Sequence, residues 1–328
     1  MIDMTVTVLL LIAGLALILA GANYLVDGAS RIASRFGISD IVIGMTIVAI
    51  GTSAPEAVVS FLGTLKGSVG ITVGNIVGSN ICNILLILGL TCALVPLKIT
   101  RDNLGKDLQF LTISSLVLII ICFDNQINQL LIDDDMSQNV ISRGEGLVML
   151  ILFCIFLGYN FFTAKRKEEF EQEKKEVVKK NIWISLLMFA GGLAALIYGG
   201  NLLVDSATDI AKRLGVSDLV IASTIVAVGT SIPELATSVI AAIKKKGELA
   251  LGNVVGSNVF NVFLILGGCS VISPLQLSGI NHSHFVFLLV STLVLVLFSA
   301  TRRRISRSEG ILLLALYVLY VYSTITVG

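Results

Sequence analysis

Long uncharged runs alternate with short polar connections along the whole chain. About 20 apolar residues in a helix are enough to cross the hydrocarbon core of a membrane. The pattern predicts an all-α integral membrane protein with ten spans, at residues 4–26, 41–65, 70–95, 108–123, 146–163, 182–204, 219–243, 248–273, 284–300 and 309–326.

Composition supports a membrane protein and excludes several other classes. Of the 328 residues, 55% are apolar and 14% charged, whereas a soluble domain carries about 25% charged residues. The net charge of +1, with no concentrated basic patch, argues against nucleic-acid binding. Five cysteines without a C-x-x-C pair indicate neither a disulfide framework nor a zinc site. We find no nucleophile–base pair or phosphate loop, so we expect no enzyme and no cofactor.

The basic residues predict the orientation of the chain. One set of alternate connections between the predicted spans holds 19 Lys and Arg residues, and the other set holds 4. Cytoplasmic loops of membrane proteins carry the excess of positive charge. Both termini are therefore predicted to lie outside the cytoplasmic membrane, which requires an even number of spans.

The chain contains an internal repeat. A shift of 178 residues aligns Gly21–Leu90 with Gly199–Gly268 without a gap, and 36 of the 70 pairs are identical. The most similar blocks are GTSAPE with GTSIPE, and GNIVGSNICN with GNVVGSNVFN. The repeat predicts two five-helix halves, 1–163 and 182–328, joined by a polar cytoplasmic linker, 164–181.

The number of spans in each half determines how the halves are related. Because five is odd, the second half enters the membrane from the opposite side, which gives an inverted-topology repeat. Such repeats are typical of secondary transporters that bind their substrate near the membrane midplane.

Two carboxylates lie in the middle of predicted spans at equivalent repeat positions. They are Glu56 and Glu234, and neither span has a Lys, Arg or His in its apolar centre. A charged side chain at the membrane centre costs about 2.5–3.5 kcal/mol, so such residues normally mark an ion pathway. A buried ion pair would need a cation that these spans do not provide. We therefore predict that the positive charge is supplied by a transported ion.

A proline precedes each glutamate. Pro55 and Pro233 cannot donate a backbone hydrogen bond, so the helices are predicted to break and to free the carbonyls of Gly51 and Gly229. Free carbonyls at membrane depth must line a cavity or bind a partner. The same segments provide the hydroxyls of Thr52, Ser53, Thr230 and Ser231.

The third and eighth predicted spans add neutral oxygen donors. The side chains are Ser79, Asn80 and Asn83, with the repeat equivalents Ser257, Asn258 and Asn261. Spacings of three and four residues place the first and last members of each set on one helical face. Carboxylate, hydroxyl, amide and carbonyl oxygens suit sodium, calcium or magnesium, and they disfavour zinc and copper.

The paired GTS-x-PE and GN-x-x-GSN-x-x-N motifs resemble those of the calcium:cation antiporter superfamily, most closely its prokaryotic sodium/calcium exchangers. The resemblance covers essentially all ten spans. It implies two inverted sets of five helices and exchange of cytoplasmic calcium for external sodium by alternating access. It also implies metal ligands at Glu56 and Glu234, with Thr52, Thr230, Ser53, Ser231, Ser79, Ser257, Asn83, Asn261 and the carbonyls of Ala49 and Ala227.

One position departs from several relatives. Potassium-dependent exchangers carry Asp where this chain has Asn261, so the resemblance disfavours potassium co-transport. Two other functions stay open from the sequence. A calcium/proton antiporter of the same fold would carry protons on the buried glutamates, and a passive cation channel would need no exchange of ions.

The distribution of basic residues yields a test of topology. A cysteine introduced at Gln172 should be shielded from an impermeant thiol reagent in intact cells, because its connection is predicted to be cytoplasmic. A cysteine at Ser137 should react. Labelling of Gln172→Cys alone would reverse the orientation, and equal labelling of both would contradict the division into five plus five spans.

Overall fold

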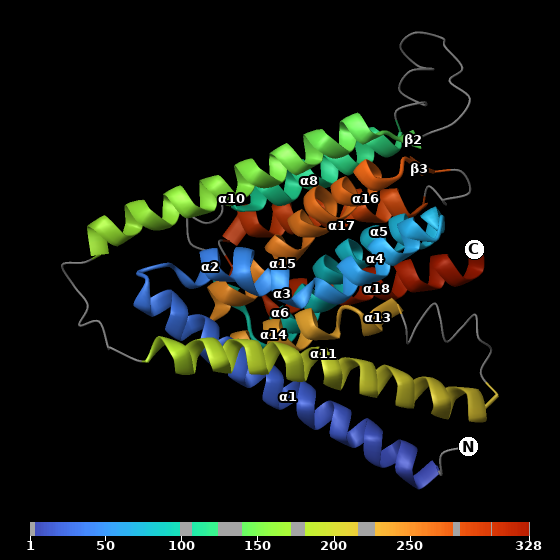
Figure 1. The fold of residues 1–328 in the computed structure, drawn as a ribbon, viewed down its shortest axis with the longest axis horizontal. Helices are drawn as coiled ribbons and strands as arrows, with labels where there is room; N and C mark the ends of the chain where they lie inside the picture. The colour runs from blue at the N-terminus through green and yellow to red at the C-terminus, as the bar shows by residue number, and fades with distance from the viewer. Residues whose placement is uncertain are drawn as a thin grey trace.

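The structure is a computed structural model that describes residues 4–98, 107–123, 140–171, 181–215, 227–277, 283–302 and 304–327. These residues form helices, apart from turns and four two-residue strands. The N-terminus and the C-terminus lie at the same end of the molecule (Figure 1). Some polar or predicted segments lie outside the described residues. They are the three aspartates at 133–135, the histidine at 282 and the first part of the seventh predicted span.

The first half contains one long helix, a broken segment and a central run. The elements are α1 (Met4–Arg35), α2 (Asp40–Ile43), η1 (Gly44–Val48), α3 (Ala49–Thr52), α4 (Ala54–Leu65), α5 (Val69–Cys82), η2 (Asn83–Ile87), α6 (Leu88–Leu94), α8 (Asp107–Cys122) and α10 (Arg143–Glu171). The η segments are π-helical turns.

The second half follows the same order. Its elements are α11 (Ile182–Arg213), α13 (Ala227–Gly229), α14 (Ile232–Ile243), α15 (Gly247–Val259), η4 (Phe260–Leu266), α16 (Gly267–Ile272), α17 (Ser283–Arg302) and α18 (Arg307–Val327). The four strands are β1 (Leu97–Lys98), β2 (Val140–Ile141), β3 (Leu275–Gln276) and β4 (Arg304–Ile305). Strand β1 pairs antiparallel with β4, and β2 pairs antiparallel with β3.

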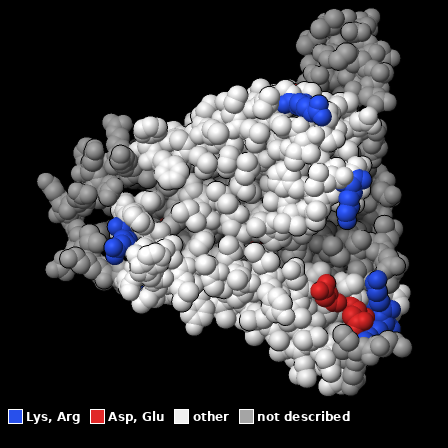
Figure 2. All heavy atoms as spheres, viewed as in Figure 1, with Lys and Arg blue, Asp and Glu red and all other residues white. Residues whose placement is uncertain are grey.

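The helices have the length and composition of membrane spans. Five helices could each cross a membrane, or six if Asp40–Thr52 and Ala54–Leu65, bent by 49°, count as one span. Three further apolar helices are shorter: Leu108–Cys122, Ile232–Ile243 and Ser283–Ser299. The broad middle of the face in Figure 2 shows no charged side chain, and the visible charges lie near its edges. The chain is a multi-pass, all-helical membrane protein.

Three helices extend beyond their predicted boundaries. Helices α1 and α11 continue nine residues past the predicted ends at 26 and 204, and α10 continues eight residues past 163, into the predicted linker. The predicted helix ends lie where hydropathy falls, at the first polar residues after each apolar run. Backbone hydrogen bonding continues through these residues because most of them are compatible with a helix.

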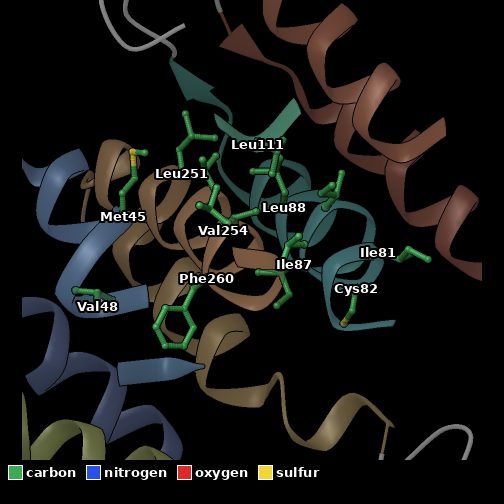
Figure 3. Close-up of a cluster of buried hydrophobic side chains, with 14 of the residues drawn as sticks. Met45, Val48, Ile81, Cys82, Ile87, Leu88, Leu111, Leu251, Val254 and Phe260 are labelled. Carbon is green, nitrogen blue, oxygen red and sulfur yellow. The ribbon is translucent and has the colours of Figure 1, made fainter. Parts of the chain in front are cut away.

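Two central helical runs form the core. In the most apolar 18-residue stretch of each helical run, 94% of the residues are buried in α15–η4–α16 and 78% in α5–η2–α6. The corresponding share is 22% in α1 and in α11. Figure 3 shows side chains of both runs meeting in one cluster, including Ile87, Leu88 and Val254, with Met45 and Val48 from η1. The two repeat segments that carry the GN-x-x-GSN motif are therefore the centre of the molecule.

Helices α1 and α11 pack antiparallel with their backbones in close contact (Figure 1). A Cβ atom at Gly14 would lie 2.9 Å from the Gly199 carbonyl oxygen, and one at Gly21 would lie 2.8 Å from the Gly192 carbonyl oxygen. Gly192 is the repeat equivalent of Gly14, and Gly199 is that of Gly21. The contact is therefore two-fold symmetric, and small residues allow the close approach.

This contact predicts different effects at two adjacent glycines. Gly192→Ala should destabilise the protein by about 1–3 kcal/mol, because its methyl group would lie 2.5 Å from the Leu25 backbone nitrogen. Gly191→Ala is the matched control, since its Cβ meets no described atom within 4 Å. Thermal unfolding of both variants in detergent measures the difference, and equal stabilities would contradict the close packing.

Candidate cation site

Two broken helices supply the carboxylates. Helix α3 ends at Thr52 and α4 begins at Ala54, with Ser53 between them at φ −81° and ψ 9°. The second half repeats the break at Ser231, with φ −89° and ψ 7°. The predicted interruptions are confirmed at both positions, but the Gly51 carbonyl is not left free, because it accepts a backbone N–H at the end of α3. Each proline lies in the first turn of the following helix, where a missing N–H is tolerated, and each glutamate follows in that turn.

The hydroxyl at each break bonds to the carboxylate of the opposite half. Ser53 Oγ donates to Glu234 Oε1 over 2.9 Å, and Ser231 Oγ donates to Glu56 Oε1 over 3.0 Å. Both glutamates are 1% exposed. The fold thus brings residues separated by about half of the chain into one buried cluster.

An asparagine anchors each glutamate-bearing helix to the central run of its own half. Asn75 Nδ2 donates to the Glu56 carbonyl over 3.2 Å and to Ser60 Oγ over 3.0 Å. Asn253 Nδ2 makes the equivalent bonds to the Glu234 carbonyl, at 3.3 Å, and to Ser238 Oγ, at 3.0 Å. These bonds fix the position of the glutamate backbone relative to the core.

The central runs meet through a second set of amide contacts. Asn83 Nδ2 donates to Asn258 Oδ1 over 3.4 Å, and its repeat equivalent Asn261 donates to Asn80 Oδ1 over 3.0 Å. Asn83 begins the π-helical segment η2, and Asn261 lies in the π-helical segment η4. Such π-bulges occur frequently at functional sites.

Among the described residues, four buried acceptor oxygens at equivalent repeat positions have no hydrogen-bond partner. They are Oε2 of Glu56 and of Glu234, and Oδ1 of Asn83 and of Asn261. Leaving a buried polar group unpaired costs about 1–3 kcal/mol, and more for a charged group. A cation bound at the carboxylates would neutralise them and satisfy their unpaired oxygens, so the residues fit a cation as transported substrate.

The other predicted ligands differ in their hydrogen-bond partners. Thr52 Oγ1 donates to Asn253 Oδ1 over 3.0 Å, whereas Thr230 Oγ1 has no partner. The Ala49 carbonyl accepts from Ser53 N at 3.0 Å and from Thr52 Oγ1 at 3.4 Å. Ala227 is the first residue of α13, and Ser79 and Ser257 are buried on α5 and α15. Ligand roles for these six residues stay a prediction.

Four polar residues of this region have hydrogen-bonding roles that were not predicted from the sequence. Asn75 and Asn253 are the second residues of the repeated GN-x-x-GSN block, and Ser60 and Ser238 follow the glutamates by four residues. All four are identical between the halves and lie in apolar spans. A polar residue that is identical in both halves and lies in an apolar span indicates a buried hydrogen bond, because a buried polar residue needs a partner.

The composition of the cluster limits the ion. Among the described residues no group of three or more His, Cys, Asp or Glu side chains could hold a metal. Two carboxylates surrounded by neutral oxygens favour a hard cation such as calcium or sodium. A bundle of apolar helices with such a cluster at its centre defines a membrane cation transporter.

Sequence and structure comparisons identify the family. The model of the sodium/calcium exchanger protein family matches residues 6–162 and 184–326. The chain therefore belongs to the sodium/calcium exchanger family and is a transporter, not an enzyme. It is 35% identical to the putative antiporter CaxA of Alkalimonas amylolytica over 97% of this chain and 98% of that protein.

Two further relatives carry the exchanger name. The sodium/calcium exchanger MaX1 of Methanosarcina acetivorans is 32% identical over 96% of this chain and 97% of its own length. A solved structure of the sodium–calcium exchanger NCX_Mj, soaked with zero Na⁺ and Ca²⁺, is 34% identical and superposes with a TM-score of 0.80. The match covers 98% of this chain and 100% of that chain.

The cluster predicts stabilisation by calcium. Calcium at 100 times its dissociation constant should stabilise the purified protein by about 2.7 kcal/mol, because binding favours the folded state. Glu56→Gln and Glu234→Gln should each lose most of this increment, measured as the shift in melting temperature on calcium addition. Glu145→Gln is the control, since Glu145 caps α10 by accepting from Ser142 N, outside the cluster. If calcium raises the melting temperature of both site variants as much as that of the unmodified protein, the predicted cation site is wrong.

Proposed function

We propose that this protein is a secondary active antiporter that exports calcium in exchange for sodium by alternating access. In this proposal ten spans form two inverted halves, 1–163 and 182–328, connected by the cytoplasmic linker 164–181. The protein resides in the cytoplasmic membrane with both termini outside. The main support is the set of buried, unpaired acceptor oxygens at equivalent repeat positions, Glu56 Oε2, Glu234 Oε2, Asn83 Oδ1 and Asn261 Oδ1.

The two carboxylates are the central ligands in this proposal. Hydroxyl and amide oxygens near them complete sites for calcium or for several sodium ions. The proposed ligands are Glu56, Glu234, Thr52, Thr230, Ser53, Ser231, Ser79, Ser257, Asn83 and Asn261, with the carbonyls of Ala49 and Ala227. Ser53 and Ser231 already donate to the carboxylates, so their hydroxyl oxygens keep lone pairs that can face an ion.

Charge makes the two loads mutually exclusive. With two ionised glutamates the cluster carries −2, so one calcium gives a neutral site, whereas three sodium ions give +1. The cluster cannot hold both loads without accumulating positive charge in a low-dielectric environment. An empty pair of carboxylates would pass through the membrane interior only at a large desolvation cost. The conformational change is therefore favoured when calcium or sodium is bound and disfavoured when the site is empty. This coupling produces exchange.

A calcium/proton antiporter is the second candidate. The support for it is the burial of both glutamates, because a buried carboxyl group can carry a proton. Sodium is favoured because the cluster has hydroxyl and amide oxygens in equivalent pairs, and these groups bind sodium but do not carry protons between the two sides at neutral pH. Two relatives support sodium as well, because MaX1 and NCX_Mj are sodium/calcium exchangers.

Ion flux in reconstituted vesicles tests the proposal. Calcium-45 uptake should be driven by an outward sodium gradient, should be unaffected when potassium replaces choline, and should respond to membrane potential, because a three-for-one exchange moves net charge. Glu56→Gln and Glu234→Gln should lower uptake to the level of protein-free vesicles, and Glu145→Gln should transport normally. Uptake that follows a pH gradient in sodium-free buffer would favour proton coupling. Calcium flux independent of both gradients would favour a channel.

A further inference from the structure

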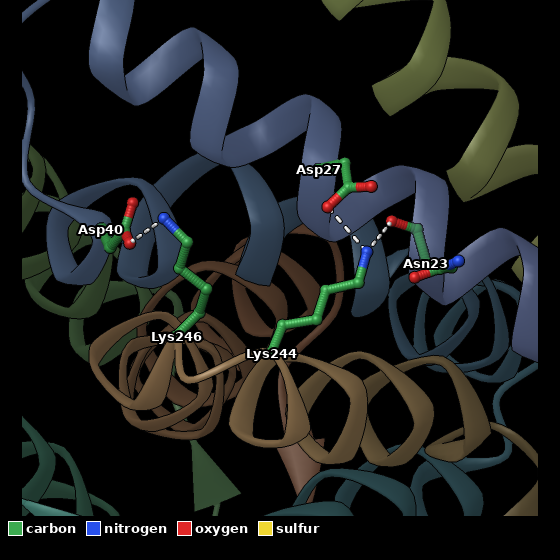
Figure 4. A network of polar contacts seen from close by, with 5 residues as sticks. All are labelled: Asn23, Asp27, Asp40, Lys244 and Lys246. Carbon is green, nitrogen blue, oxygen red and sulfur yellow. Dashed lines mark hydrogen bonds and ion pairs between the residues drawn. The ribbon is translucent and has the colours of Figure 1, made fainter.

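Ion pairs connect α1 and α2 to the turn between α14 and α15. Lys244 Nζ lies 2.6 Å from Asp27 Oδ1 and donates to the Asn23 carbonyl over 3.1 Å. Lys246 Nζ lies 3.0 Å from Asp40 Oδ2. Figure 4 shows both lysines extending from the turn to the acidic side chains. The ion pairs thus hold α1 against the second half at the end of the bundle opposite to the chain termini.

The internal repeat preserves three residues of this network. The shift of 178 residues relates Asn23 to Asn201, Asp27 to Asp205 and Lys244 to Lys66, and all three pairs are identical. In the segment 61–70, compared with 239–248, the lysine is the only identity. A lysine retained where its surroundings have diverged indicates that its charge is used in both halves.

Only one of the two equivalent ion pairs is formed. Among the described residues, Lys66 and Asp205 are exposed and form no ion pair with each other, whereas Asp27 and Lys244 are in contact. Helix packing shows the same difference. Helix α1 packs on α14, whereas, among the described residues, the repeat equivalent α11 makes no comparable contact with α4. In the part of the chain that the structure describes, the two ends of the bundle therefore differ in ion pairing and in helix packing.

The residues near the carboxylates show the same asymmetry. Thr52 is fully buried and donates to Asn253 Oδ1, but its repeat equivalent Thr230 is only partly buried and its hydroxyl has no partner. The end that carries Lys244 is thus closed by an ion pair and by the packing of α1 on α14, and the described residues at the other end make neither contact.

We propose that Asp27–Lys244 and Asp205–Lys66 are alternative electrostatic latches, one at each end of the protein, and that only one is closed at a time. The inference rests on the proposed exchange function, because exchange requires each end to close in turn. Lys246 adds a second ion pair to the first latch, whereas its repeat equivalent is the uncharged Ser68. The charge difference favours the state closed at the Lys244 end.

Cross-linking tests the two latches directly. Asp27→Cys with Lys244→Cys, and Asp205→Cys with Lys66→Cys, are treated in vesicles with a short bifunctional thiol reagent. The chain has native cysteines, and Cys154 is exposed. Peptide mapping is therefore used to show which two cysteines each product joins. Each pair should cross-link, each cross-link should stop calcium flux until the linker is cleaved, and in a protein with all four cysteines no molecule should carry both cross-links.

The bias between the latches gives a second measurement. In the Asp205→Cys/Lys66→Cys protein, Asp40→Asn or Lys246→Gln should raise the rate of cross-linking about two- to five-fold, because a partly exposed ion pair contributes little but measurable free energy. Lys245→Gln is the matched control: it removes a charge from the same turn, and no ion pair of Lys245 occurs among the described residues. Equal rates in all three variants would overturn the bias.

The outcomes separate the latches from the transport function. Both cross-links in one molecule, or no Asp205→Cys/Lys66→Cys product in a protein that exchanges ions before treatment, would overturn the latch proposal. Mutually exclusive cross-links in a protein without sodium-dependent calcium flux would support the latches and contradict the proposed exchange function.

Discussion

The hydrogen bonds between each serine and the glutamate of the opposite half are the contacts on which the site depends. Ser53 donates to Glu234 and Ser231 donates to Glu56, so neither half can form the cluster alone. The serines can reach across because each lies at a helix break, where its side chain is not held against a regular helix. Two prolines therefore influence a contact between residues far apart in the sequence.

The surrounding structure holds these breaks in place. Asn75 and Asn253 tie the glutamate backbones to the central runs, and those runs are the most deeply buried segments of the protein. Helices α1 and α11 are far less buried than these runs, although α1 contributes Leu25 and Val26 to the hydrophobic core, and close backbone contact at glycines holds the pair together. The site thus combines a rigid, hydrogen-bonded centre with peripheral helices that share fewer contacts with it.

Symmetry at the centre coexists with asymmetry at the ends. Each cross-half serine–glutamate bond has its equivalent, and so does each pairing of the small strands. In contrast, the contact of Lys244 with Asp27 has no formed equivalent, and Thr52 and Thr230 differ in burial and in bonding. Among the described residues, the two similar halves are thus joined symmetrically at the site and asymmetrically at the ends of the bundle.

The sequence alone was enough to predict the membrane class, the repeat, the helix breaks and the two central glutamates, because hydropathy, proline chemistry and buried charge act locally along the chain. It did not determine where the long helices end, since backbone hydrogen bonding continues past the apolar residues of α1, α10 and α11. Nor did it assign Asn75 and Asn253, whose partners are known only once α4 packs on α5 and α14 on α15. Only the tertiary structure decided that Ser53 bonds to Glu234 rather than to Glu56, because that choice depends on how the two halves cross.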